Sequence, residues 1–438
     1  QQQQLEYDFV VAPGADPRAI KMRFTGAHQL RIAENGDLVM RVKGHEIRHH
    51  KPFIYQTDAQ GARQPIAGRY LLQHKNQVSF ALGEYDKTKE LVIDPLTYST
   101  YLGGYEGDDK AFAISVGGCT GACDSYITGE VASLTFPDTN LVGQHGGKDV
   151  FVTRLNATGT APVFFTFFGG PGDDSGRGIE VDAAGYSYVV GIMGAGFVLP
   201  PGHNGFKTTD PSPSSDDGFA VKFGPMGNLL NFTFLGGSGF DQANAVVLKG
   251  TDVCIAGQTY SPDFINQTSA DTPYDISYNG GMDAFVTGLS GDLVTVNYFT
   301  FLGGGNMDYG NGIDTYNGLL YVVGNTQSSN FPVSATPFDK TLTGFAPVDA
   351  FVTCIDPKAG TAGLKYSTFL GGNGREYGYG IAVNKTNGQF YVTGRSHSQG
   401  ITATNYSPTS SGFPVTTGTA YQTTQNGFGD VFVTRFNV

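Results

Sequence analysis

The residues with the clearest chemical signature are at positions 45–50, which read HEIRHH. From His45 to His49 they match H-E-x-x-H, in which two histidines one helical turn apart bind zinc beside a glutamate base. Gly44 precedes the pattern, Pro52 follows it, and apolar and polar residues alternate before it, which favours a strand over a helix. On a strand the two histidines would lie about 13 Å apart. We therefore expect a solvated strand here and no catalytic zinc site.

A second set of candidates is an acidic residue that follows each of five Gly-Gly pairs by four or five positions. The set comprises Asp109, Asp174, Asp241, Asp308 and Glu376. Five carboxylates around one opening could bind Ca²⁺ or a polyol, or supply an acid and a base. However, repetition in every unit is what a structural role requires, and each acid could cap its own turn. We favour turn capping and keep these residues as binding candidates, with Ca²⁺ the only cofactor considered.

Three further candidates each occur in one repeat unit only. Arg177, Arg375 and Tyr379 lie in or next to segments where the other units carry different residues. Binding and catalysis usually depend on such exceptions, so these three join the candidate binding site. A second repeated acid opens the phrase DVFVTRL and its relatives, and we give it the same structural interpretation; its members are Asp149, Asp217, Asp283, Asp349 and Asp430.

The chain has four cysteines. Cys119 and Cys123 lie in the Gly-rich segment GGCTGACDSY, and we expect them to close a small disulfide loop. Cys254 and Cys354 lie within strand patterns, where free cysteines pack as small hydrophobic residues. One disulfide points weakly to an exported protein.

The elements that position these candidates come from an internal repeat. TYLGG, TFFGG and TFLGG begin at residues 100, 166, 233, 300 and 368, and each copy is separated from the next by 66–68 residues. Between them recur a strand ending in Gly, such as SYVVG, and the DVFVTRL phrase. Four short antiparallel strands at this period are typical of a β-propeller blade. Small residues alternate on the first strand of every unit, as expected at a crowded central axis.

The units also indicate how the ring closes. The first YSTYLGG (98–104) is a fourth strand with no partners before it, and the last unit lacks a fourth strand. We expect the segment 97–102 to complete the fifth blade, which leaves no open sheet edge. The prediction is an all-β chain with a five-bladed β-propeller at 97–438, closed by an N-terminal strand. Residues 1–96 alternate apolar and polar residues in short runs and predict a small antiparallel β domain.

The phrases YSTYLGG, YGYGIAVNKTNGQFYVTG and GDVFVTRFN resemble the SBBP family of bacterial β-propeller repeats. That family is named for seven blades, whereas this chain shows five. The segment from GDLVMRVKGHEIRHH to LVIDPLTYSTYLGG resembles the β-rich domain that commonly precedes such repeats. The resemblance implies a secreted or cell-surface protein, often of Bacteroidota, and a component or cargo of an outer-membrane secretion or gliding system. It implies no reaction.

Composition excludes several functions. The formal net charge is −12, which disfavours nucleic-acid binding, and we find no apolar run of membrane-spanning length. The chain starts QQQQLEYDF without Met, which is typical of a processed N-terminus. We expect a non-enzymatic, exported protein that acts in binding, adhesion or assembly and presents its long loops to a protein or glycan. The alternative is a carbohydrate-active lyase or hydrolase with carboxylates and tyrosines at the propeller mouth.

Overall fold

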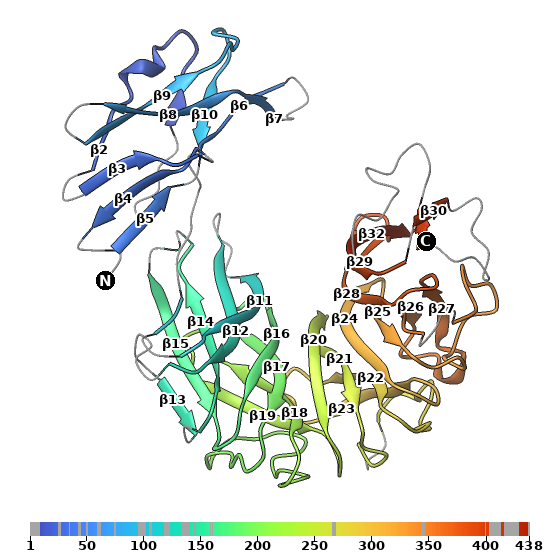
Figure 1. The fold of residues 1–438 in the computed structure, drawn as a ribbon. Coiled ribbons are helices and arrows are strands. Elements are labelled where there is room, and N and C mark those ends of the chain that lie inside the picture. The colour runs from blue at the N-terminus through green and yellow to red at the C-terminus, as the bar shows by residue number, and fades with distance from the viewer. Residues whose placement is uncertain are drawn as a thin grey trace. The chain divides into compact units, whose positions relative to one another are not determined.

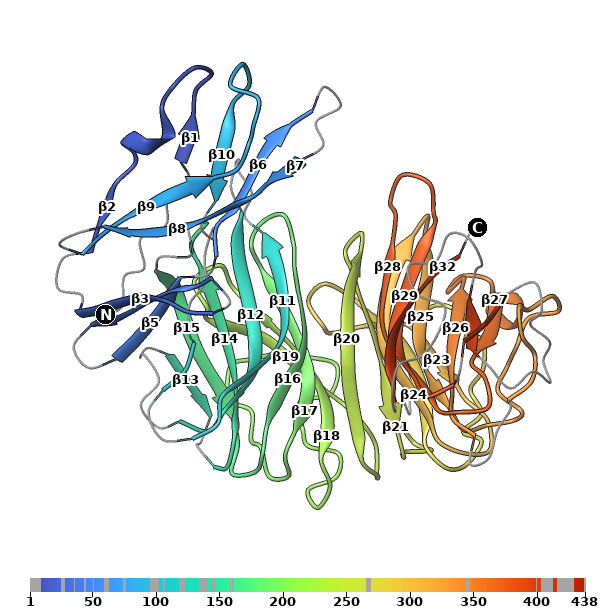
Figure 2. The same ribbon diagram turned by 45° about the horizontal axis from the view of Figure 1, so that its top comes forward.

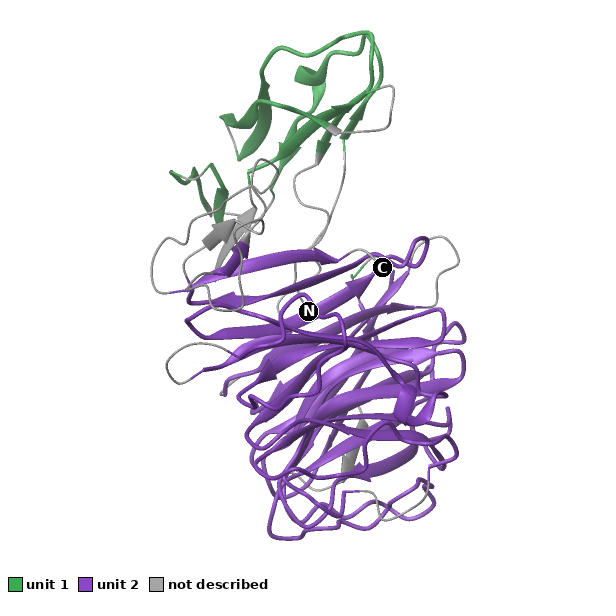
Figure 3. Ribbon diagram, turned by 90° about the vertical axis from the view of Figure 1, so that its right-hand side faces the viewer, with its two compact units in different colours: residues 1–101, 158–160 green, residues 102–157, 161–438 purple. Residues whose placement is uncertain are grey.

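The computed structural model describes residues 9–24, 28–34, 36–42, 45–49, 51–58, 63–73, 76–94, 102–104, 107–117, 123–133, 140–143, 146–157, 159, 161–264, 269–342, 347–398, 400–402, 413–415 and 429–436. The chain forms two compact units, residues 1–101 with 158–160 and residues 102–157 with 161–438 (Figure 3). Both are built from β-strands, and the described helices are two short 3-10 turns, η1 (Pro17–Ala19) and η2 (Gly360–Ala362). In the described part of the chain, none of the helices has the length and apolar character that crossing a membrane requires.

The N-terminal unit contains three small antiparallel sheets. One has the order β1-β10-β6-β7, with β1 at Phe9–Val11, β6 at Phe53–Thr57, β7 at Arg63–Ile66 and β10 at Leu91–Asp94. The second has the order β2-β9-β8, with β2 at Met22–Arg23, β8 at Gly68–Gln73 and β9 at Gln77–Leu82. The third consists of β3 (His28–Ile32), β4 (Leu38–Val42) and β5 (His45–His49). Their shared core includes Leu38, Ile54, Tyr70, Val78 and Leu91.

The H-E-x-x-H segment is a strand, as predicted. It forms β5 and pairs in antiparallel register with β4, with Val42 opposite His45 and Leu38 opposite His49. The two histidines are therefore the first and last residues of a five-residue strand, and the helical spacing that a zinc protease requires is not present.

The C-terminal unit contains five successive sheets, which we number 1 to 5. Sheet 1 has β11 (Lys110–Gly117), β12 (Asp124–Val131), β14 (Asp149–Leu155) and β15 (Pro162–Gly169), with β13 (Asn140–Gly143) added parallel to β15. Sheet 2 has β16 (Ser175–Val181), β17 (Ser187–Met193), β18 (Asp217–Phe223) and β19 (Leu229–Leu235). Sheet 3 has β20 (Asp241–Lys249), β21 (Asp252–Thr259), β22 (Asp283–Leu289) and β23 (Val296–Leu302). Apart from β13, every neighbouring pair is antiparallel and consecutive in the chain.

The last two sheets follow the same plan. Sheet 4 has β24 (Asp308–Tyr316), β25 (Leu319–Thr326), β26 (Asp349–Ile355) and β27 (Leu364–Leu370). Sheet 5 has β28 (Glu376–Val383), β29 (Phe390–Ser396) and β32 (Asp430–Phe436), and a short parallel pair, β30 (Gly400–Thr402) and β31 (Phe413–Val415), lies in its long loop. The predicted closing strand at 97–102 falls mostly on residues outside those described, so the fourth strand of sheet 5 stays a prediction.

Consecutive sheets pack face to face, with their first strands side by side (Figures 1 and 2). A separate apolar core fills each of the four interfaces. The first strands approach closely, since a Cβ added to Gly178 would lie 3.2 Å from the Cα of Ala245 in the next sheet. This explains why small residues recur on the first strand of each unit, as the sequence indicated.

The first strand of every sheet contains the same β-bulge. Pairing with the second strand skips one residue in each sheet, between Ala111 and Ala113 in sheet 1 and at the matching place in the others. The glycine that ends the YVVG phrase lies against this bulge. A Cβ on Gly324 would lie 1.7 Å from the carbonyl oxygen of Tyr309, and the equivalent distances in the other sheets are 1.8–2.1 Å. The bulge therefore requires that glycine.

Two faces of this unit are apolar and exposed. In sheet 1, the side chains of Ile114 and Val116 are 66% and 62% exposed. The residues at the position of Ile114 in sheets 2, 3 and 4 are only 5–8% exposed, because they pack on the preceding sheet. These residues are Ile179, Val246 and Ile313. In sheet 5, Val431 and Val433 are 79% and 71% exposed. Their equivalents in sheet 1, Val150 and Val152, are fully buried against sheet 2. Both faces therefore have the composition of a sheet-to-sheet interface.

Three of the four cysteines lie in the described part of the chain. Cys123 is disulfide-bonded, and its predicted partner Cys119 lies outside the described residues. Cys254 and Cys354 are free and buried. The phenylalanines of two Phe-Pro pairs in the described loops pack on their own sheets, with the rings of Phe331 and Phe351 4.4 Å apart and those of Phe413 and Phe432 4.7 Å apart.

Candidate functional site

The acid after each Gly-Gly pair accepts a hydrogen bond from the backbone N–H of the second glycine. The donor–acceptor distances are 2.8 Å for Gly104 and Asp109, 2.6 Å for Gly170 and Asp174, 2.8 Å for Gly237 and Asp241, 2.7 Å for Gly304 and Asp308, and 2.9 Å for Gly372 and Glu376. Four of the five acids are fully buried, and Asp109 is half-buried. This is the geometry of turn capping.

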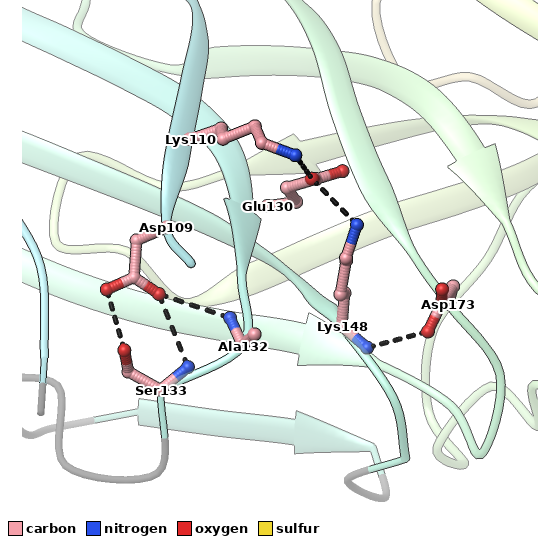
Figure 4. Close-up of polar contacts among 7 residues, drawn as sticks. All are labelled: Asp109, Lys110, Glu130, Ala132, Ser133, Lys148 and Asp173. Atoms are coloured by element: carbon pink, nitrogen blue, oxygen red, sulfur yellow. Dashed lines mark hydrogen bonds and ion pairs between the residues drawn. The ribbon is translucent and has the colours of Figure 1, made fainter. Parts of the chain in front are cut away.

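A hydroxyl or an amide at the end of the second strand completes each cap. Ser261 and Ser328 donate to Asp241 and Asp308 at 2.7 and 2.8 Å, and Ser133 donates to Asp109 at 2.7 Å (Figure 4). In sheet 2 the backbone N–H of Gly194 donates to Asp174 at 2.7 Å. Each acid therefore joins a Gly-Gly turn to the second strand of the same sheet, and no carboxylate of this set points at the solvent as a ligand would require.

The second repeated acid lies beside the first one. A Cβ on Gly236 would lie 2.0 Å from Oδ1 of Asp217 and 2.7 Å from Oδ2 of Asp241, and Gly303 has the same relation to Asp283 and Asp308. Burial raises the pKa of Asp217 to about 9, and the charges of Asp241 and Asp210 add to the increase. Burial likewise raises the pKa of Asp283 to about 7. Burial and the charge of the neighbouring acid both favour the protonated form of these carboxyl groups over a second buried charge.

The described residues do not bring three or more His, Cys, Asp or Glu side chains into a group that would hold a metal ion. The expectation that Ca²⁺ binds at these acids therefore has no support from a set of ligands in the described residues, and we assign no role to a metal ion.

The extra residue of the β-bulge is Asn in sheets 3 and 4 and a different residue in each of the other sheets. We name these residues the bulge row, which consists of Phe112, Arg177, Asn244, Asn311 and Tyr379. Bulges are frequent next to functional sites because they redirect a side chain. Phe112, Arg177 and Tyr379 each occur in one sheet only, so the repeat does not explain the identities of these three.

The two asparagines of the bulge row connect neighbouring sheets. Nδ2 of Asn244 donates to the carbonyl oxygen of Gly310 at 2.8 Å, and Nδ2 of Asn311 donates to that of Gly378 at 2.8 Å. Asn311 also donates to Oδ1 of Asn325 at 2.9 Å. In sheets 3 and 4 the bulge residue therefore bridges to the next sheet, and both Nδ2 hydrogens of each asparagine are bonded within the protein.

A charged cluster lies beside the bulge in sheet 1 (Figure 4). Glu130 accepts from the ammonium groups of Lys110 and Lys148, each at 3.0 Å. Glu130 is almost buried, and burial alone would raise its pKa, but the two lysines outweigh this effect and lower it. The backbone N–H of Lys148 donates to Asp173 at 3.0 Å. Sequence reasoning missed this cluster because its residues belong to different elements.

Aromatic rings gather at the bulge of sheet 5. The rings of Tyr377 and Tyr379 are stacked, with centroids 6.3 Å apart and an interplanar angle of 7°. His397 packs edge-on against Tyr377 with centroids 6.1 Å apart. Tyr379 is 54% exposed. A half-exposed pair of parallel rings is a suitable surface for the apolar face of a sugar.

The structure thus divides the predicted site residues. Arg177 and Tyr379 belong to the bulge row, whereas Arg375 is exposed in the turn before β28, where its carbonyl oxygen accepts from His397. The repeated acids lie inside the turns. Asn244 and Asn311 were not among the candidates, and alignment of the first strands would have found them at the position of Arg177 and Tyr379.

Comparison with known proteins adds little to this assignment. Residues 1–96 match a family described as Domain of unknown function (DUF7948). No curated protein matches the chain. Solved structures that align include two mutant forms of an apocarotenoid oxygenase from Synechocystis, both 11% identical, covering 90% of this chain and 76% of theirs, with TM-scores of 0.29 and 0.28. Such TM-scores establish neither a shared fold nor a shared activity.

Proposed function

We propose that the five sheets are the blades of a five-bladed β-propeller. Two observations support this proposal. Each sheet packs on the next through its first strand, and the exposed apolar faces of sheets 1 and 5 are the two faces that a ring would bring together. Closure would bury Ile114 and Val433 as their equivalents are buried in the other sheets.

We further propose that the protein is an exported or cell-surface binding protein without enzymatic activity, which acts in adhesion or assembly. The observation that carries this proposal is the contrast between repeated and single-copy residues. The repeated acids and glycines serve the turns and bulges of the fold, whereas the residues that change from sheet to sheet gather in the bulge row. A surface of tyrosines and one arginine suits a glycan, and the long loops of the same sheets offer a place for a protein partner. The resemblance to SBBP repeats supports export and a link to an outer-membrane secretion or gliding system of Bacteroidota.

The alternative, a carbohydrate-active lyase or hydrolase, needs a carboxylate or tyrosine that can exchange protons with a substrate. The repeated carboxyl groups are committed to turns, and burial raises the pKa of Tyr309 in sheet 4, which opposes a role as a base. The repeated carboxyl groups and Tyr309 therefore support a binding function better than a catalytic one.

A glycan array tests the binding function directly. Labelled protein should bind a subset of oligosaccharides, and Tyr379→Ala should weaken that binding at least tenfold because it removes half of the stacked pair. Met226→Ala is the matched control, because Met226 is a large exposed side chain (63%) on the turn between β18 and β19. In parallel, capture from cell envelopes should recover a protein partner. Binding to no glycan together with recovery of no envelope component would refute the proposal.

A further inference from the structure

Arg177 differs from every other member of the bulge row. Its guanidinium lies over the ring of Phe112 in the preceding sheet, with 4.4 Å between Cζ and the ring centroid. Asn244 and Asn311 use their donors to bridge to the next sheet, but Nε of Arg177 is buried and has no hydrogen-bond partner. A buried guanidinium N–H without an acceptor is costly, and each such group calls for an explanation.

The acidic side chains around Arg177 have other partners. Glu130 is held by Lys110 and Lys148, and Asp173 accepts from the backbone of Lys148. Asp174 accepts the N–H groups of Gly170 and Gly194. None of the ion pairs among the described residues involves Arg177, so its guanidinium has no carboxylate partner in this part of the chain.

The surroundings of Arg177 favour an anion despite the overall negative charge of the protein. The ammonium of Lys148 is within electrostatic range of Arg177, and it is held in place by Glu130. An incoming carboxylate would therefore meet one guanidinium able to form two parallel hydrogen bonds and one nearby ammonium. Phe112 covers one face of the guanidinium and leaves its edge, which carries the N–H groups that carboxylates bind.

The rest of the bulge row indicates what carries the carboxylate. The amides of Asn244 and Asn311 are used to bridge the sheets, whereas the stacked tyrosines of sheet 5 are half-exposed and suit a sugar ring. A peptide would need unpaired backbone groups or an apolar pocket beside Arg177, whereas the tyrosines offer a stacking surface. A chain of sugars that bears carboxylate groups satisfies both the guanidinium and its neighbours.

We propose that Arg177, with Phe112 and Lys148, forms a carboxylate subsite for an acidic glycan built from uronic acids. The inference rests on the proposed glycan-binding function and names the substrate class of the same site. Arg177 would bind the carboxylate in bidentate fashion, and Lys148 would add charge without direct selectivity.

Calorimetric titration with oligogalacturonate, and with the same oligosaccharide after its carboxyl groups are reduced to alcohols, tests the subsite. Wild-type protein should bind the acidic form at least tenfold more tightly than the reduced form. Arg177→Gln should remove this preference and leave the affinity for the reduced form unchanged. Arg177→Lys, which keeps the charge, should restore only part of the preference because it lacks the planar fork. Lys358→Gln removes one exposed charge on the turn between β26 and β27 and should behave as wild type.

The outcomes of the titration distinguish failure of the carboxylate subsite from failure of the glycan-binding function. Equal affinity of wild-type protein for both forms, or an unchanged preference in Arg177→Gln, overturns the subsite while the glycan-binding function stands. Binding to neither form also overturns the subsite, and the glycan array then decides whether glycan binding as a whole fails. Thermal denaturation of each variant shows that a lost preference is not a loss of folding.

Discussion

At the residue scale, the most consequential feature is the pair of acids at each junction between sheets. Asp217 and Asp241 share one buried place beside Gly236, and Asp283 and Asp308 share another beside Gly303. Burial raises the pKa of each of these carboxyl groups, to about 9 for Asp217, 7 for Asp283, and 6 for both Asp241 and Asp308. A carboxyl group with a raised pKa is stabilised in its protonated form, so the fold depends on protons held between the sheets.

This arrangement predicts that stability falls as the pH rises. A group whose pKa is higher in the folded state contributes its full stability below the unfolded value, 3.8 for Asp, and loses it as the pH passes the folded value. Between pH 5 and pH 9 the Tm of the protein should fall by about 5 °C or more. In Asp217→Asn a neutral amide replaces the acid, so part of this decrease should disappear, as calorimetry at several pH values would show.

Asp216→Asn provides the control for that experiment, because Asp216 is adjacent in sequence and only half-buried. It should keep the wild-type pH dependence. The charge of Lys207 partly offsets the effect at Asp217, since it lowers the pKa of that acid. If Tm were equal at pH 5 and pH 9, or highest at pH 9, the account of buried protonated carboxyl groups would be wrong.

At the element scale, the bulge in the first strand and the glycine at the end of the second strand form one device. The bulge brings a carbonyl oxygen of the first strand, that of Tyr309 in sheet 4, to the place where a Cβ on the second strand would lie. Only glycine therefore fits at that position of the second strand, which is Gly324 in sheet 4. The same bulge directs one side chain per sheet away from the regular alternation of the strand. A single local irregularity therefore explains both a repeated glycine and a variable site residue.

Substitution of that glycine tests the device. Gly324→Ala would place a methyl group 1.7 Å from the carbonyl oxygen of Tyr309 and 2.8 Å from Phe351, and should lower the free energy of unfolding by about 2–4 kcal/mol. Gly288→Ala is the control, because Gly288 is also a buried strand glycine but its Cβ would have its nearest contact at 3.6 Å. Chemical denaturation should show that Gly288→Ala lowers the free energy of unfolding by less than about 1 kcal/mol. Equal effects of the two changes would contradict the steric account.

Most strands and turns of the five sheets were predictable from the sequence, because the same phrases recur in each unit. Five copies of YVVG and DVFVTRL place the strands, because alternation and turn residues agree in every copy. The capping role of Asp174 and Asp308 was also predictable, since an acid at a fixed distance from Gly-Gly in each unit serves the turn. The bulge was not, because its extra residue looks like part of a continuous strand pattern. Glu130 and Lys148 could not be joined from sequence, because their contact depends on the packing of different strands.

At the scale of the whole molecule, the question is what covers the outer faces of sheets 1 and 5. Val431 and Val433 on sheet 5 occupy positions that are buried in every interface between consecutive sheets, and the positions of Ile114 and Val116 on sheet 1 are buried or partly buried there. Exposed apolar area of this kind costs free energy in water. A closed five-bladed ring removes that cost by packing the two faces together, and the same closure would complete the bulge row around one axis.

Charge insertion distinguishes a closed ring from an open stack of sheets. In a closed ring Ile114→Lys buries an unpaired charge and should lower the free energy of unfolding by about 3–5 kcal/mol, close to the effect of Ile179→Lys at an established interface. In an open stack Ile114→Lys should cost less than about 0.5 kcal/mol, as we expect for Val198→Lys, whose side chain is 80% exposed in a loop. Chemical denaturation of the three variants provides the measurement. We expect Ile114→Lys to resemble Ile179→Lys, because Val431 and Val433 carry the complementary apolar surface; resemblance to Val198→Lys would exclude closure.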